Sequence, residues 1–89
     1  KGFAPFQGVI ASPRLDCVVA AATGQSREKA SRMIAAGLVM KNHEPLESPS
    51  ASVEEGDVLS IRGKGRYLID RLGPVTKKGR LSIAGRKCL

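Results

Sequence analysis

Four basic side chains stand near the starts of two predicted helices, at Arg14, Arg27, Lys29 and Arg32. Lys29 and Arg32 are three residues apart, so they share one flank of the second helix. The free N–H groups and the positive dipole end at the start of a helix both favour an anion. If the helices are antiparallel neighbours, we expect these cations to converge on consecutive phosphates. The alternative is a solvated face with local ion pairs, because Asp16 and Glu28 lie close by.

A second basic cluster alternates with glycines directly after a predicted strand. Arg62, Lys64 and Arg66 are separated by Gly63 and Gly65. Glycine lets a backbone approach a phosphate chain closely, so the cluster is suited to binding a sugar–phosphate backbone. The spacing of a nucleotide-binding P-loop is missing. The alternative reading is a flexible connection between two strands.

A third basic cluster lies in a predicted tight turn and consists of Lys77, Lys78 and Arg80 around Gly79. An exposed basic hairpin tip can reach into a groove or across a nucleic-acid backbone. The same residues can instead keep an edge strand soluble.

Catalytic and metal-binding patterns are weak in this chain. His43, the single histidine, falls in a predicted turn without a serine or cysteine signature beside it. Cys17 and Cys88 lack the spacing of a metal site, and we expect both to be reduced thiols of a cytoplasmic protein. We therefore predict no enzyme activity, no cofactor, no metal and no small-molecule substrate.

The charge distribution indicates a polyanionic partner. The 89 residues carry a net charge of +7, yet residues 62–89 hold nine basic side chains against one acid, Asp70. The first 61 residues hold six basic and seven acidic side chains. Such asymmetry is typical of proteins that bind nucleic acid. With only three aromatic residues, stacking on rows of aromatic rings is not expected. Tyr67 fits a core position better than a base-stacking one.

The hydrophobic periodicity predicts the elements that position these clusters. Ser12 and Pro13 are typical of a helix start, and Leu15, Val18, Val19 and Ala22 follow as one apolar stripe up to Gly24. Ser26 is predicted to cap a second helix that ends at Gly37. We expect strands at 38–41, 58–62 and 67–72 and around Leu81 and Ile83, with a turn at 42–45. The prediction is an α+β fold, a helical hairpin packed on a small, mostly antiparallel sheet.

The ends of the chain carry fewer signals. Residues 1–11 contain Pro5 and two glycines without a clean period, so we expect a leading arm or linker. The chain begins with Lys1, and we interpret it as a piece of a longer protein. We expect no signal peptide, because the N-terminal residues lack an apolar stretch of the needed length, and no apolar run is long enough to span a membrane.

Several short motifs together resemble a known domain. They are Arg14-Leu15-Asp16, Ser26-Arg27 with Ala30, Met33-Ile34, Gly37-Leu38-Val39, Asn42, and Gly56-Asp57 with Leu59 and Ile61. Their order and spacing resemble the ribosomal protein S4-type RNA-binding domain, with its αL-type fold. The continuation through residues 62–67 and 76–80 is similar to the C-terminal part of the YlmH family. That resemblance implies binding of ribosomal RNA and tRNA on the large ribosomal subunit, in ribosome-associated quality control.

The resemblance also implies a set of RNA-binding residues: Arg14, Ser26, Arg27, Lys29, Arg32, Lys41 and Asn42. It divides the chain into a leading arm at 1–11, an S4-type core at 12–62 and a basic C-terminal β-hairpin extension at 63–89. Two residues depart from the usual pattern of the family. Lys41 stands where the pattern has an apolar residue, and His43 stands where it often has a glycine. We therefore expect either that Lys41 faces outward and joins the binding surface or that the strand is shifted.

Two other functions fit the same residues. Pseudouridine synthases and tyrosyl-tRNA synthetases carry similar domains, so the chain could be an accessory arm of an RNA-modifying or aminoacylating enzyme. A protein–protein adaptor that docks on an acidic partner would also use exposed basic residues.

Overall fold

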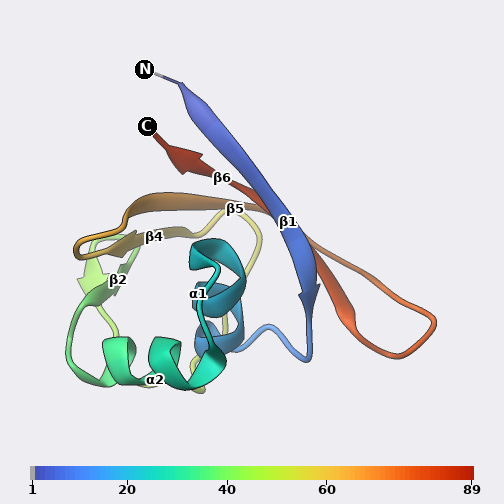
Figure 1. Cartoon of the computed structure of the whole chain (residues 1–89), viewed down its shortest axis with the longest axis horizontal. Coiled ribbons are helices and arrows are strands. Elements are labelled where there is room, and N and C mark those ends of the chain that lie inside the picture. The colour runs from blue at the N-terminus through green and yellow to red at the C-terminus, as the bar shows by residue number, and fades with distance from the viewer. Residues whose placement is uncertain (1) are drawn as a thin grey trace.

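Two helices cover one face of a six-stranded antiparallel sheet (Figure 1). The computed structural model describes residues 2–89. The strands are β1 (Phe3–Ile10), β2 (Val39–Lys41), β3 (Glu44–Pro45), β4 (Val58–Ile61), β5 (Gly65–Val75) and β6 (Leu81–Cys88), and the helices are α1 (Leu15–Thr23) and α2 (Arg27–Ala35). The sheet order is β1-β6-β5-β4-β2-β3. The predicted α+β fold with a helical hairpin on an antiparallel sheet is confirmed.

The hydrophobic core lies between the helices and the sheet. The helices contribute the buried side chains Leu15, Val18, Val19, Ala30 and Ile34, and the strands contribute Val39, Leu59, Ile61, Tyr67, Ile69 and Ile83. Burying each of these larger apolar side chains stabilises the fold by about 1.5–3 kcal/mol relative to leaving it in water. Tyr67 is only 3% exposed, so the prediction that it belongs to the core is confirmed.

Helix α1 begins later than predicted, at Leu15 rather than after Ser12. Arg14 is extended and forms a β-bridge with Ser52 in the loop before β4, where the N–H of Val53 donates to the carbonyl of Pro13. The first amides of the helix, those of Leu15 and Asp16, donate to carbonyl groups of this same loop. A tertiary contact therefore replaces the expected side-chain cap.

The other helix ends follow the local sequence. The Ser26 hydroxyl accepts a hydrogen bond of 3.1 Å from the N–H of Lys29, as expected of a helix N-cap. Gly24 ends α1 in the left-handed conformation, with φ of 71°, and its N–H donates to the carbonyl of Ala20. Both predictions are confirmed.

The expectation that residues 1–11 form a loose leading arm is wrong, because Phe3–Ile10 is strand β1. It pairs antiparallel with β6 along its whole length, from Phe3 opposite Cys88 to Ile10 opposite Leu81. Pro5 is tolerated because β1 is an edge strand, where a missing N–H donor costs no ladder hydrogen bond. The ring of Phe6 packs on Gly85, where an added Cβ would lie 2.7 Å from the ring and also meet the carbonyl oxygen of Leu68.

The predicted C-terminal hairpin exists as β5 and β6, but it lies in the middle of the sheet. Strand β5 pairs with β4 on one side and with β6 on the other, and β6 pairs in turn with β1. Residues 63–89 therefore supply core side chains to the same sheet that carries the helices. Among residues 2–89, none of the helices is long and apolar enough to cross a bilayer.

The turn predicted at residues 42–45 is shorter than expected, because Asn42 and His43 form the turn whereas Glu44–Pro45 is strand β3, paired with β2. Asn42 and His43 both have positive φ, 51° and 74°, as two-residue hairpin turns of this kind require. This conformation explains why a glycine suits the position of His43. Lys41 pairs with Leu59 of β4 in the register of the sheet, so the strand is not interrupted at this residue.

Candidate nucleic-acid interface

A buried carboxylate holds two of the predicted RNA-binding arginines. Asp16 lies at the start of α1 and is 2% exposed. The guanidinium of Arg14 donates to both of its oxygens, at 3.2 and 3.0 Å, and Nε of Arg27 approaches Oδ2 at 3.4 Å. The hydroxyl of Ser31 on α2 also donates to Asp16, at 3.4 Å. The carboxylate therefore joins the N-terminal ends of the two helices and fixes the direction of both arginines.

The charges around Asp16 keep it ionised. Burial by itself raises the pKa of the Asp16 carboxyl. Hydrogen bonds from Arg14 and from the N–H of Cys17, together with the charges of Arg14 and Arg27, more than offset this effect, so the pKa lies below its ordinary value. The same hydrogen bond and charge of Asp16 raise the pKa of Arg14. Both arginines remain about half exposed, with 42% and 52% of their side-chain surface open to solvent.

Lys29 and Arg32 lie on a different flank of α2. Both are exposed, and they border a shallow hollow together with Met33, Ala36 and Leu38. Within residues 2–89, neither side chain forms an ion pair. The four cations predicted to converge are thus divided into two pairs, Arg14 with Arg27 and Lys29 with Arg32.

The side chains of Lys41 and Asn42 form hydrogen bonds within the domain. The ammonium group of Lys41 donates to the carbonyl of Ser52 at 3.1 Å and lies 3.8 Å from Asp57. The amide of Asn42 donates to Asp57 at 2.9 Å, and its oxygen accepts from the N–H of Val58. These contacts tie the β2–β3 turn to the start of β4. The Ser26 hydroxyl is similarly engaged as the cap of α2.

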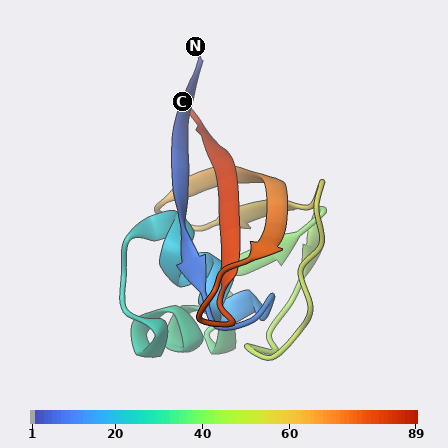
Figure 2. The same ribbon diagram turned by 90° about the vertical axis from the view of Figure 1, so that its right-hand side faces the viewer.

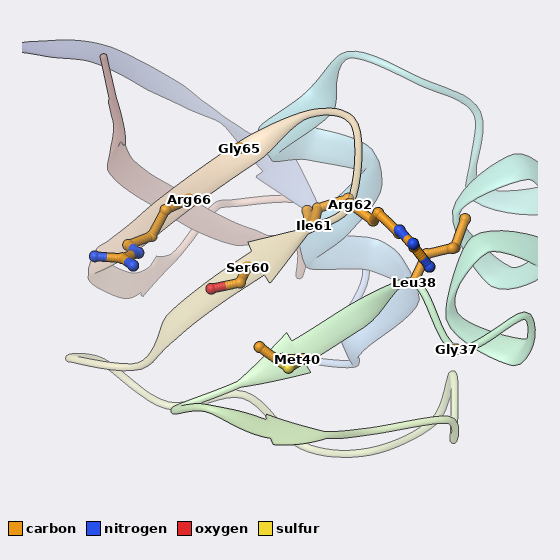
Figure 3. Close-up of a pocket in the computed structure, with 8 residues that line it drawn as sticks. All are labelled: Gly37, Leu38, Met40, Ser60, Ile61, Arg62, Gly65 and Arg66. Carbon is orange, nitrogen blue, oxygen red and sulfur yellow. The ribbon is translucent and has the colours of Figure 1, made fainter.

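Arg62, Lys64 and Arg66 surround the sharp turn between β4 and β5 and are exposed. Arg62 and Arg66 border a groove of about 530 Å³ whose other lining residues include Leu38, Met40 and Ser60 (Figure 3). The N–H of Arg62 donates to the carbonyl of Leu38 at 2.9 Å, which fixes the turn against the end of α2. Leu38 borders both this groove and the hollow of Lys29 and Arg32. The fold thereby joins two clusters that are thirty residues apart in sequence.

The predicted basic hairpin tip projects from the β5–β6 connection, which faces the viewer in Figure 2. Lys77 and Lys78 are exposed at the tip, and Thr76 closes it through its hydrogen bonds with Gly79 and Arg80. Arg80 turns back toward β1, with its guanidinium 3.5 Å from the carbonyl oxygen of Val9. Arg80 and Arg27 border one shallow hollow beside α1.

Sequence reasoning missed two features of this surface. Asp16 was recognised only as a charge that could neutralise its neighbours. Its place close to Arg14 at the start of a helix is the sequence signal that could have identified it as a carboxylate that orients arginine side chains. The contribution of Leu38 and Met40 to a groove had no sequence signal, because it depends on how β2 and β4 pair.

The S4 domain model matches residues 13–59, just over half of the chain. The chain belongs to the S4 domain family. The matched residues run from the start of α1 to β4 and contain Asp16 with both of its arginines and the Lys29–Arg32 flank. The resemblance to the S4-type RNA-binding domain is confirmed.

A curated relative extends the match beyond this domain. The chain is 44% identical, over 74 residues, to the ribosome-associated protein quality control protein P2 of Bacillus subtilis. The aligned part is 83% of this chain and 29% of the relative, so the chain spans less than a third of that protein's length. Since 74 residues exceed the S4 match, the similarity includes strands outside it. The resemblance to the YlmH family is confirmed.

Proposed function

We propose that this chain is a non-catalytic RNA-binding domain that recognises structured RNA, ribosomal RNA or tRNA on the large ribosomal subunit. Its role would be in ribosome-associated quality control in the cytoplasm. The S4 family match and the role given in the name of the Bacillus relative support this proposal. The relative is described as ribosome-associated, and its similarity to this chain includes the S4-type helices.

The observation that carries the proposal is the arrangement of exposed cations around α2. Arg14 and Arg27 are held at one end by Asp16, and Lys29 and Arg32 continue toward the β4–β5 turn. One guanidinium group can donate two parallel hydrogen bonds to two oxygens of a phosphate, whereas a lysine ammonium group acts as a point charge. A surface of this kind recognises the shape and the phosphates of RNA and makes few contacts that depend on base identity.

The aromatic side chains do not offer a stacking platform for single-stranded RNA. Tyr67 is buried, and Phe6 is half-buried against Gly85 and Tyr67. Phe3 is 53% exposed, but the guanidinium of Arg86 covers one face of its ring at 4.8 Å. Without a row of free rings, folded RNA is the better ligand.

The proposal is tested by measuring the affinity of the purified chain for large ribosomal subunits, small subunits and tRNA at several salt concentrations. We expect binding to large subunits with a log–log salt slope of about −4 to −5, as six phosphate contacts predict. Equal binding to small subunits would contradict the choice of the large subunit. Absence of binding to every RNA at low salt would overturn the proposal as a whole.

A further inference from the structure

We propose that the groove bordered by Leu38, Met40, Ser60, Arg62 and Arg66 holds one unpaired nucleotide of the bound RNA. This inference rests on the proposed function and adds a second, base-contacting site to a surface that otherwise binds phosphates. The groove has a volume of about 530 Å³, within the range of pockets that hold small organic ligands.

The floor of the groove is a row of side chains across three strands. Met40 of β2 lies opposite Ser60 of β4, and Ser60 lies opposite Arg66 of β5. Their neighbours Val39, Leu59 and Tyr67 are buried under the helices, so the row faces the other side of the sheet. Strands lie about 4.8 Å apart, and the row therefore spans about 10 Å. Leu38 and Arg62 close one end of the groove (Figure 3).

The chemistry of the row changes along its length. Met40 is 36% exposed, and a methionine thioether makes favourable contacts with aromatic rings, which a nucleobase presents on both faces. The Ser60 hydroxyl can donate and accept hydrogen bonds at the edge of a base. The side chains of Arg62 and Arg66 extend toward opposite sides of the groove in Figure 3, where each could bind a phosphate next to the nucleotide. An apolar platform, a polar edge and two cations are the three features that a nucleotide requires.

The charges of the groove are available for a ligand. Within residues 2–89, neither Arg62 nor Arg66 forms an ion pair or a side-chain hydrogen bond. Leu38 borders both the groove and the hollow of Lys29 and Arg32 on α2, so the two lie next to each other. A backbone bound along Lys29 and Arg32 can therefore continue to Arg62, and the base of the nucleotide between them can enter the groove.

An acidic peptide would match the same charges, but the sheet does not favour one. Extended peptides commonly bind by adding a strand to a free sheet edge. The groove lies over β2, β4 and β5, and each of these strands already has a neighbour on both sides. Without a free edge, the peptide backbone would lose the hydrogen bonds that provide affinity in this binding mode. The observations therefore favour a nucleotide.

The experiment compares a fully paired RNA hairpin with the same hairpin carrying one bulged fluorescent adenine analogue. The chain contains two methionines, and only Met40 lines the groove, so the methyl NMR signal of Met40 reports occupancy directly. We expect the bulged hairpin to bind about two- to tenfold more tightly, the range that a methionine–ring contact provides. We also expect the fluorescence and the Met40 signal to change with the bulged hairpin only.

Two matched pairs of variants test whether the preference for the bulged hairpin arises in the groove. Met40→Ala should abolish the preference for the bulge, whereas Val9→Ala, at an exposed apolar position on the distant strand β1, should retain it. Arg66→Ala should reduce the preference more than Lys64→Ala, because Lys64 has the same charge in the same turn but does not line the groove.

Each other outcome is decisive. Equal binding of the two hairpins with an unchanged Met40 signal would overturn the nucleotide site and leave the proposed function standing. Failure of both hairpins and of ribosomal RNA to bind would overturn both. A Met40 signal that responds to an acidic peptide and not to the bulged hairpin would make the groove a protein-binding site and overturn this inference.

Discussion

The two basic regions of this surface are organised in opposite ways. Arg14 and Arg27 share the buried carboxylate of Asp16, which orients them but cancels part of their charge. Arg62 and Arg66 stand beside a groove without an acidic partner among residues 2–89. The first region is held by hydrogen bonds and has a reduced net charge, whereas the second keeps its full charge and lacks such contacts among residues 2–89. If the proposed RNA-binding role holds, the first region would set the orientation of the RNA and the second would attract it.

The difference between the two regions depends first on Asp16. We expect Asp16→Ala to lower the free energy of unfolding by about 2–3 kcal/mol, because it removes charged hydrogen bonds to Arg14 and to the amide of Cys17 in a buried position. Urea denaturation followed by circular dichroism measures the loss. Glu28→Ala, an exposed acidic position on α2, is the control and should change stability by less than about 0.5 kcal/mol. Equal effects would show that Asp16 does not organise the helix ends.

RNA affinity should depend more on the cations around α2 than on those of the β5–β6 hairpin tip. We expect the double variant Arg27→Ala and Lys29→Ala to weaken binding to ribosomal RNA at least about tenfold, with the fold retained because Arg14 still neutralises Asp16. Lys77→Ala with Lys78→Ala removes the same charge from the exposed hairpin tip and should cost about threefold. Filter binding at constant salt measures both. A larger loss from the tip variant would reverse the comparison.

Acid should remove the contribution of Asp16 selectively. Since folding lowers the pKa of Asp16, its stabilisation is fully present above the unfolded pKa, about 3.9, and is lost as pH falls through the folded pKa. The difference in unfolding free energy between the wild type and Asp16→Asn should therefore shrink between neutral pH and about pH 2. Urea midpoints at several pH values test this. A difference that stays constant would mean that the charge of Asp16 contributes nothing.

The smallest effect is expected at a second carboxylate that also binds arginine. Asp70 accepts two hydrogen bonds of 2.9 Å from Arg86, and these lower the pKa of Asp70, but the pair is exposed. Solvent screens such a pair, so Asp70→Asn should leave the urea midpoint within error of the wild type. A midpoint shift as large as that of Asp16→Ala would show that burial is not what separates the two sites.

The helices could be predicted from residues close in sequence, whereas strand β1 and the arrangement of the candidate site depend on pairing between strands that are far apart in sequence. The Ser26 cap and the Gly24 terminus depend on residues within one turn, so their conformations followed from the sequence. Strand β1 was not predicted, because its partner β6 is more than seventy residues away in sequence. In addition, Pro5 is typical of a loop and is tolerated here only because β1 is an edge strand. The charges of the candidate site were visible in the sequence. Their division around α2 depends on the contacts of Asp16 with Arg14 and Arg27, and their continuity through Leu38 depends on how β2 and β4 pair.

The pairing of β1 with β6 also determines how the domain responds to force. The two strands are antiparallel, and the N–H of Leu89 donates to the carbonyl of Gly2, so both described chain ends lie at the same end of the ladder (Figure 1). Tension applied between them loads the backbone hydrogen bonds one after another, as in opening a zipper, instead of shearing all of them together. The edge strand would peel away first and uncover Phe6 and Gly85 while the helices still hold their arginines.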